Sequence, residues 1–135
     1  LLIDELLAGR GLERSLRHGD DVRIVTDPRR FERVVGNLID NAQRHGEGLT
    51  DLLVERTEYG LRLTLDDAGP GIPEDLAGQI FEPFARRDST SQDGAGLGLA
   101  IVREQVRLLG GHVSVLTSPD GGARFVVSIP DRGNL

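Results

Sequence analysis

The sequence lacks cysteine and lysine, and each absence excludes a class of site. With no cysteine among its 135 residues, the chain can form neither a disulfide framework nor a thiolate metal site, and we expect a cytoplasmic location. All 16 basic residues are arginine, so the phosphate-binding loop GxxxxGK[ST], which needs a lysine at the terminal phosphates, is missing. A P-loop enzyme is therefore excluded.

Long apolar runs and an excess of basic charge are missing as well. No stretch approaches the roughly 20 apolar residues of a membrane span, and no signal peptide opens the chain. Because the chain starts at Leu1, we expect it to be part of a longer protein, and an inner-membrane anchor elsewhere in that protein stays open. The net charge of -6 argues against nucleic acid as a partner.

Periodicity and turn residues predict one domain with a single core. A capping Asp27, Pro28 at the first helical position and an apolar row at helical spacing predict a long helix from Pro28 to about His45. The other expected elements are a helical lead-in over 1–18, strands over 22–25, 50–56, 61–66, 113–116 and 124–129, and helices over 74–80 and 97–109. This order predicts an α/β two-layer sandwich, in which helices pack on one face of a mixed, mostly antiparallel sheet.

The long predicted helix carries a polar stripe that suits a metal-bound nucleotide. At about 100° per residue, Asn37, Asn41, Arg44 and His45 fall beside the apolar row, at the edge of the core. The alternative is that these side chains merely cap the helix or face water. Two asparagines one turn apart make that alternative weaker.

A glycine-containing turn, DAGPGI, follows directly on a predicted strand, from Asp67 to Ile72. The glycines would let the backbone approach a ligand closely, and a buried Asp67 could accept a hydrogen bond from an amine. The pattern is also a common turn, so taken alone it leaves both interpretations open. Asp66, its neighbour, is expected to be solvated.

Two further segments have chemistry that suits phosphate. GAGLGL, from Gly94 to Leu99, opens a predicted helix, whose amides and positive end form an anion site; it is no dinucleotide fingerprint, because GxGxxG fails at Leu99. FEPFARR, residues 81–87, combines two aromatic rings that can hold a loop with two guanidiniums that can reach phosphate. We favour Arg86 over Arg87, and a solvated arginine pair is the alternative.

Together and in this order, the segments closely resemble the ATP-binding catalytic domain of two-component sensor histidine kinases, in the superfamily shared with DNA gyrase, related heat-shock chaperones and mismatch-repair ATPases. NLIDNAQRHG resembles the Asn-rich box, DAGPGI the first glycine box, FEPFAR the phenylalanine box and GAGLGLAIVRE the second glycine box; GGARF is similar to the last strand entry. The resemblance covers residues 20–130, with 1–19 as a lead-in and 131–135 as a tail. It implies a sandwich of the Bergerat type.

The resemblance also implies a site. Asn41 would coordinate magnesium, Asn37 would lie beside the phosphates, and Asp67 would accept the exocyclic amine of adenine. Arg44 and Arg86 would contact phosphate, His45 would lie against adenine, and Asn37, Asn41 and Arg86 would be the catalytic residues. The other nucleotide-binding positions would be Gly69, Gly71, Ile72, Phe84, Gly94, Ala95, Gly96, Leu97, Gly98 and Leu99, with an ATP lid over 72–95.

The implied function is transfer of the γ-phosphoryl group of Mg-ATP to a histidine on a separate dimerisation domain, in cis or in trans, with a response regulator downstream. Gyrase-type relatives activate water with a glutamate where this chain has Asn37, so we expect slow hydrolysis. None of the three histidines, His18, His45 and His112, stands in an acceptor motif. A serine kinase of the anti-sigma-factor type and a non-catalytic nucleotide-sensing module are the alternatives, and the intact Asn41 and Asp67 speak against the second.

Overall fold

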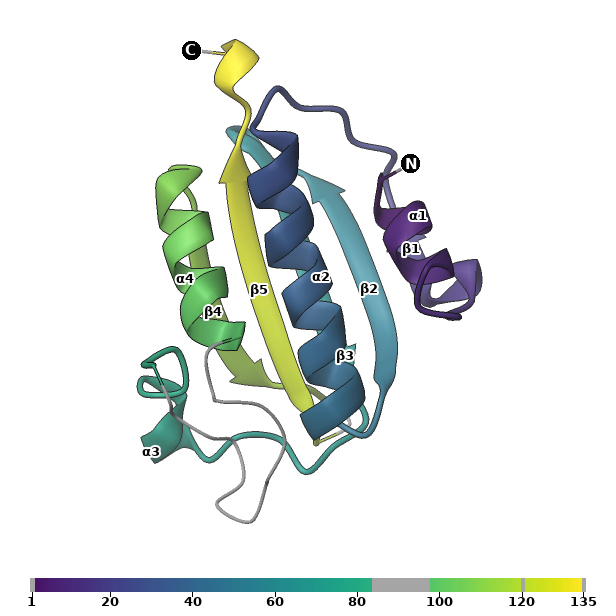
Figure 1. The fold of residues 1–135 in the computed structure, drawn as a ribbon, viewed down its shortest axis with the longest axis vertical. Coiled ribbons are helices and arrows are strands. Elements are labelled where there is room, and N and C mark those ends of the chain that lie inside the picture. The colour runs from purple at the N-terminus through teal and green to yellow at the C-terminus, as the bar shows by residue number, and fades with distance from the viewer. Residues whose placement is uncertain (1, 84–97, 120, 135) are drawn as a thin grey trace.

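The computed structural model describes residues 2–83, 98–119 and 121–134 (Figure 1). Its elements are α1 (Leu2–Ala8), the 3-10 turn η1 (Arg14–Leu16), β1 (Arg17–Gly19), α2 (Pro28–His45), β2 (Leu49–Arg56), β3 (Gly60–Asp67), α3 (Glu74–Ala77), α4 (Gly98–Leu108), β4 (His112–Thr117), β5 (Ala123–Pro130) and the 3-10 turn η2 (Arg132–Asn134). In the part of the chain so described, no helix combines the length and the apolar character that crossing a membrane requires.

The strands form one sheet in the order β1-β2-β3-β5-β4. β1 pairs with β2 in parallel, and the other neighbours pair antiparallel. α2 and α4 lie side by side in front of the sheet, and α1 lies beyond α2 on the β2 side (Figure 1). The predicted two-layer α/β sandwich with a mixed, mostly antiparallel sheet is therefore confirmed.

The long helix begins and ends at the predicted residues. The side chain of Asp27 accepts hydrogen bonds from the backbone N–H groups of Arg29 (3.0 Å) and Arg30 (3.3 Å), which have no partner within the helix. At the other end, the amides of Gly46 and Gly48 both donate to the Ala42 carbonyl, at 3.0 and 2.8 Å. These bonds fix the direction in which the chain leaves α2 for the sheet.

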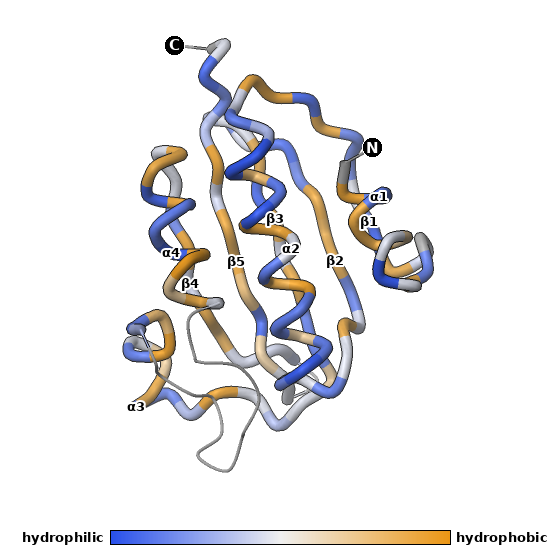
Figure 2. Tube along the Cα trace, viewed as in Figure 1, coloured by the Kyte–Doolittle hydropathy of each residue, from blue (hydrophilic) through white to orange (hydrophobic). Residues whose placement is uncertain are grey.

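The core lies between this helix layer and the sheet. The buried residues of α2 are Phe31, Val34, Val35, Gly36, Leu38, Ile39 and Ala42. In β3, Leu61, Leu63 and Leu65 alternate with more exposed residues and point into the same core, as the twofold period of a strand requires. The same pattern is visible in Figure 2, where hydrophobic and hydrophilic segments alternate along α2 and long hydrophobic stretches run through β2 and β5.

The N-terminal part of the fold differs from the prediction. The strand expected over 22–25 is wrong: this segment has no regular secondary structure and pairs with no described strand, and its Val25 is 61% exposed. Its backbone instead bonds to the C-terminal tail, because Val25 N–H donates to Asp131 Oδ1 and Arg132 N–H donates to the Val25 carbonyl, both at 2.9 Å. The edge strand is β1, which pairs with residues 52–54 of β2. The helix expected over 74–80 ends at Ala77.

Candidate active site

Asp67, the last residue of β3, lies where the C-terminal end of α2 meets the sheet. Its side chain is buried, with 3% of the residue exposed, and its Oδ1 accepts hydrogen bonds from the amides of Gly69 (3.1 Å) and Ala123 (3.0 Å). Ala123 opens β5, so an amide that is 56 residues from Asp67 in the chain helps to orient its carboxylate. A carboxylate held by two backbone amides is fixed in direction, which a specific acceptor requires.

Glycine backbone surrounds this carboxylate. A Cβ placed on Gly46 would collide with the Asp67 carboxylate, and one on Gly122 would collide with the Asp67 carbonyl oxygen. A Cβ on Gly69 would lie 2.9 Å from the Gly46 Cα, closer than real Cβ contacts allow. Side chains are thus excluded here, and α2, β3 and β5 meet through their backbones. The sequence indicated Gly69 only as a position where the backbone approaches a ligand, and it gave no sign that Gly46 packs against Asp67.

We expect Gly46→Ala to destabilise the domain by about 1–3 kcal/mol, the usual cost of adding a methyl group to a packed site. Gly78→Ala is the matched control, because Gly78 also follows a helix, has a φ of -75°, and has nothing within 4 Å of an added Cβ. Urea denaturation of both variants measures the difference. Equal stability of the two would show that the contact between Gly46 and Asp67 is not tight.

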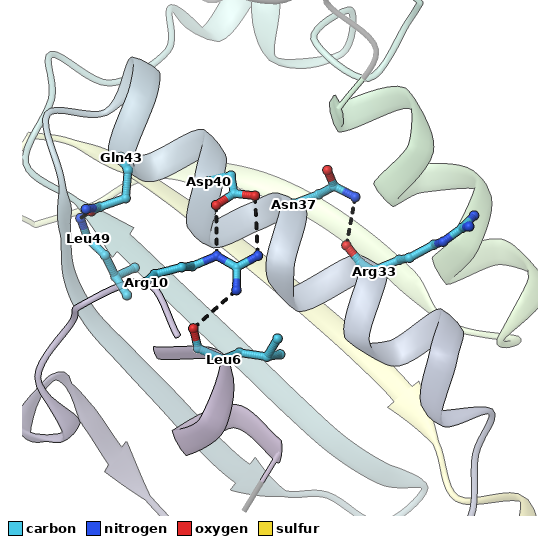
Figure 3. A network of polar contacts seen from close by, with 7 residues as sticks. All are labelled: Leu6, Arg10, Arg33, Asn37, Asp40, Gln43 and Leu49. Atoms are coloured by element: carbon cyan, nitrogen blue, oxygen red, sulfur yellow. Dashed lines mark hydrogen bonds and ion pairs between the residues drawn. The ribbon is translucent and has the colours of Figure 1, made fainter. Parts of the chain in front are cut away.

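The polar stripe of α2 lies beside this carboxylate and reaches α4. Asn37, Asn41 and His45 are half-buried, and Arg44 is exposed. The Asn37 Nδ2 donates to the Arg33 carbonyl at 2.9 Å (Figure 3), and its Oδ1 lies 3.9 Å from the place that a Cβ on Gly98 would take. The amide of Asn37 therefore faces the first residue of α4.

The remaining predicted positions divide into two groups. Gly69, Gly71 and Ile72 follow Asp67 and are buried, and the Leu99 side chain packs in the core, so only its backbone is available to a ligand. Several predicted residues, and the second half of the expected lid over 72–95, lie outside the described residues. These are Phe84, Arg86, Gly94, Ala95, Gly96 and Leu97.

Asp66 is not the solvated neighbour that the sequence suggested. It forms a bidentate ion pair with Arg124: Arg124 Nε donates to Asp66 Oδ1 at 2.7 Å, and Arg124 Nη2 donates to Asp66 Oδ2 at 2.8 Å. The Asp66 side chain is only 14% exposed. Asp66 and Arg124 are direct register partners on β3 and β5. Successive residues of a strand point to opposite faces, so Asp66 ties the two strands together on the face away from Asp67.

Of the three histidines, only His45 lies next to this site. It is the last residue of α2 and directly precedes Gly46, which packs against Asp67. The Nε2 of His18 pairs with Asp51 Oδ1 at 2.8 Å on the edge strands. His112 is exposed at the start of β4, opposite Ser128 near the far end of β5.

Comparisons with known proteins show the family to which this chain belongs. Residues 26–133 match the family model of histidine kinase-, DNA gyrase B- and HSP90-like ATPases, and the chain belongs to this family. Within it, the chain is a catalytic ATP-binding domain of the histidine kinase type. The chain resembles the crystal structure of the ATP binding domain of PrrB from Mycobacterium tuberculosis, with a TM-score of 0.72 and 32% sequence identity. The match covers 96% of this chain and 91% of that one.

Two curated relatives are histidine kinases that are several times longer than this chain. The sensor-type histidine kinase PrrB of Mycobacterium tuberculosis is 41% identical over 120 residues, which are 88% of this chain and 27% of that protein. The signal transduction histidine-protein kinase AfsQ2 of Streptomyces coelicolor is 36% identical over 106 residues, 77% of this chain and 20% of that protein. The chain thus spans between a fifth and about a quarter of the length of these relatives.

Proposed function

We propose that this domain binds Mg-ATP and transfers the γ-phosphoryl group to a histidine on a separate helical domain, as part of two-component signalling with a response regulator downstream. The observation that carries the proposal is the Asp67 carboxylate, buried and held by the amides of Gly69 and Ala123. Such a fixed acceptor suits the exocyclic amine of adenine. It disfavours guanine, which carries a carbonyl oxygen at the same position of the ring.

The base would lie between the end of α2 and the turn after β3. His45 is half-buried at the end of α2, and Ile72 is a buried apolar residue in the turn, with 7% exposed. An imidazole ring and an aliphatic side chain can cover the two faces of a purine, while Asp67 binds its edge. Gly69 and Gly71 leave the backbone close to the base because they have no side chain.

The phosphates would extend from the base toward the start of α4. Asn37 faces Gly98 there, and the first amides of a helix attract anions. Arg44 is exposed on the same stripe of α2 and supplies a positive charge for phosphate, and Arg86 is proposed for the same role. Asn41 offers an amide oxygen to magnesium. When bound, magnesium neutralises and orients the phosphate oxygens.

The carboxamide at Asn37 favours phosphoryl transfer over hydrolysis. A carboxamide cannot take a proton from water, so it cannot act as the general base of an ATPase. Asp40, which neighbours Asn41 in the chain, is engaged elsewhere: its carboxylate accepts from Arg10 Nε at 2.8 Å and Arg10 Nη2 at 3.3 Å (Figure 3). The bound nucleotide would therefore keep its γ-phosphoryl group until an acceptor side chain arrives.

The acceptor would come from another domain. In-line transfer needs an imidazole aligned with the terminal phosphate. His18 is paired with Asp51, and His112 lies toward the opposite end of the sheet from Asp67. His45, the last residue of α2, would lie beside the base. A helical hairpin that carries a histidine, in cis or in trans, would complete the active site.

The test is transfer of label from γ-labelled ATP to an added histidine-bearing hairpin from a sensor kinase. We expect acid-labile label on the hairpin and none on this chain, because no histidine of the chain is aligned with the terminal phosphate. A hairpin with His replaced by Gln is the control and should stay unlabelled. Label on this chain alone would refute the separate acceptor, and acid-stable label on a partner would instead support a serine kinase.

A further inference from the structure

A cavity of about 540 Å³ lies at the end of α2 that is far from Asp67. Its wall combines α1, the segment over 21–26, the first turn of α2 and the sheet, where Phe31, Val54 and Leu61 contribute apolar side chains. Phe31 and His45 are separated by about 20 Å along the helix at 1.5 Å per residue. None of the residues assigned to the nucleotide lines this cavity.

Two buried hydrogen-bond donors in the cavity wall have no acceptor within hydrogen-bond distance in the described part of the chain. They are the Thr26 Oγ1 and the Arg17 Nε. The Arg17 guanidinium is anchored at its other end, because its Nη2 lies 3.2 Å from Asp21 Oδ1, while its Nε lies 4.0 Å from Asp4 Oδ1. A buried donor without an acceptor costs about 1–3 kcal/mol, so both atoms favour an oxygen acceptor placed in the cavity.

The charges of the wall select against an ionic occupant. Two carboxylates, Asp4 and Asp21, and two guanidiniums, Arg17 and Arg23, line the cavity and balance one another. A carboxylate or ammonium ligand would leave an uncompensated charge in a largely apolar space, which is costly. The volume falls within the range of about 300–1,000 Å³ that is usual for small-molecule sites.

We propose that this cavity is a binding site for a small, neutral, mostly apolar molecule with an oxygen acceptor, such as an aromatic ketone. The apolar body fills the space between Phe31, Val54 and Leu61. The oxygen accepts from the Thr26 hydroxyl or from the Arg17 Nε–H. The inference does not depend on the proposed function, since it concerns the opposite end of the sheet.

Acetophenone is the probe, and amide chemical shifts of the domain are the measurement. We expect saturable shifts at residues 22–26 and at Val54, weaker binding of ethylbenzene, which has no acceptor, and no binding of benzoate, which is charged. Saturable binding confined to these residues supports the site. The absence of a saturable shift with acetophenone would overturn the proposal, and so would stronger binding of benzoate than of acetophenone.

Two valines of one segment provide a matched pair of variants. Val22 lines the cavity, whereas Val25 does not and is 61% exposed. Val22→Phe fills the cavity and should weaken acetophenone binding about tenfold or more, and Val25→Phe should change it less than about twofold. Equal binding by both variants would refute the assignment.

Circular dichroism shows whether Val22→Phe folds. If it does not, Thr26→Val tests the site independently. Removing one neutral hydrogen bond should weaken acetophenone binding about three- to tenfold. Ethylbenzene should bind this variant as it binds the parent. An equal loss for both probes, or no loss for acetophenone, would contradict a role of the Thr26 hydroxyl in this site.

Discussion

Asp67→Asn should weaken ATP binding about ten- to a hundredfold, which corresponds to losing roughly 1.5–3 kcal/mol from a hydrogen bond to a charged group. The reason lies in how the carboxylate is held. Oδ1 accepts from the amides of Gly69 and Ala123, so an asparagine must keep its oxygen there and place its NH₂ at the other position. That NH₂ would then face the amine of adenine, donor against donor.

Asp66→Asn is the matched control, because it changes the same charge on the neighbouring residue. Asp66 pairs with Arg124 on the other face of the sheet, so this variant should lose stability and keep the ATP affinity of the parent. Titration of a fluorescent ATP analogue measures both variants. The parent should also prefer ATP to GTP, and equal binding of the two nucleotides would refute adenine recognition by Asp67.

Asn41→Ala should lower phosphoryl transfer to a histidine-bearing hairpin about a hundredfold or more, as removal of one preorganised electrostatic group does elsewhere. It should also remove most of the effect of magnesium on ATP binding, because the amide oxygen of Asn41 is the proposed protein ligand. The fold should persist, since Asn41 is half-buried and lies outside the apolar row of α2. Transfer rates and ATP titrations with and without magnesium are the measurements.

Asn41→Asp distinguishes a role of Asn41 as a magnesium ligand from a role in packing. A carboxylate still offers oxygen to magnesium, so this variant should regain much of the magnesium dependence that Asn41→Ala loses. If Asn41→Ala used Mg-ATP as the parent does, the assignment of this stripe would be wrong. If both variants lost magnesium dependence equally while staying folded, the oxygen of Asn41 would not be the ligand.

The sequence predicted well those elements whose causes are local. The limits of α2 follow from Asp27 and Pro28 at one end and the glycines after His45 at the other, all within the helix or next to it. The error over 22–25 arose because a local pattern was overridden by long-range contacts. Val22 and Ile24 alternate as in a strand, but they are half-buried against the core while the backbone of Val25 bonds to the C-terminal tail.

Long-range contacts could not be predicted in this way. Asp66 meets Arg124 at a sequence distance of 58 residues, and nothing in its neighbours indicates this ion pair. The close packing of Gly46 on Asp67 likewise depends on how α2 is placed over β3. The resemblance marked Asn41 and Asp67 without any geometry. The structure adds that the amides of Gly69 and Ala123 hold the Asp67 carboxylate.

The pairing of β3 with β5 has a consequence for how the domain folds. β2 and β3 form one hairpin and β4 and β5 another, so both can form from residues close in the chain. Pairing β3 with β5 requires closure of the long segment between them. This closure costs more conformational entropy than forming either hairpin, so we expect it to be the slower step. The bond from the Ala123 amide to Asp67 is made only in that step. A folding intermediate with both hairpins formed but unpaired would contain Asp67 without the Ala123 amide that orients its carboxylate, and would be unable to recognise adenine.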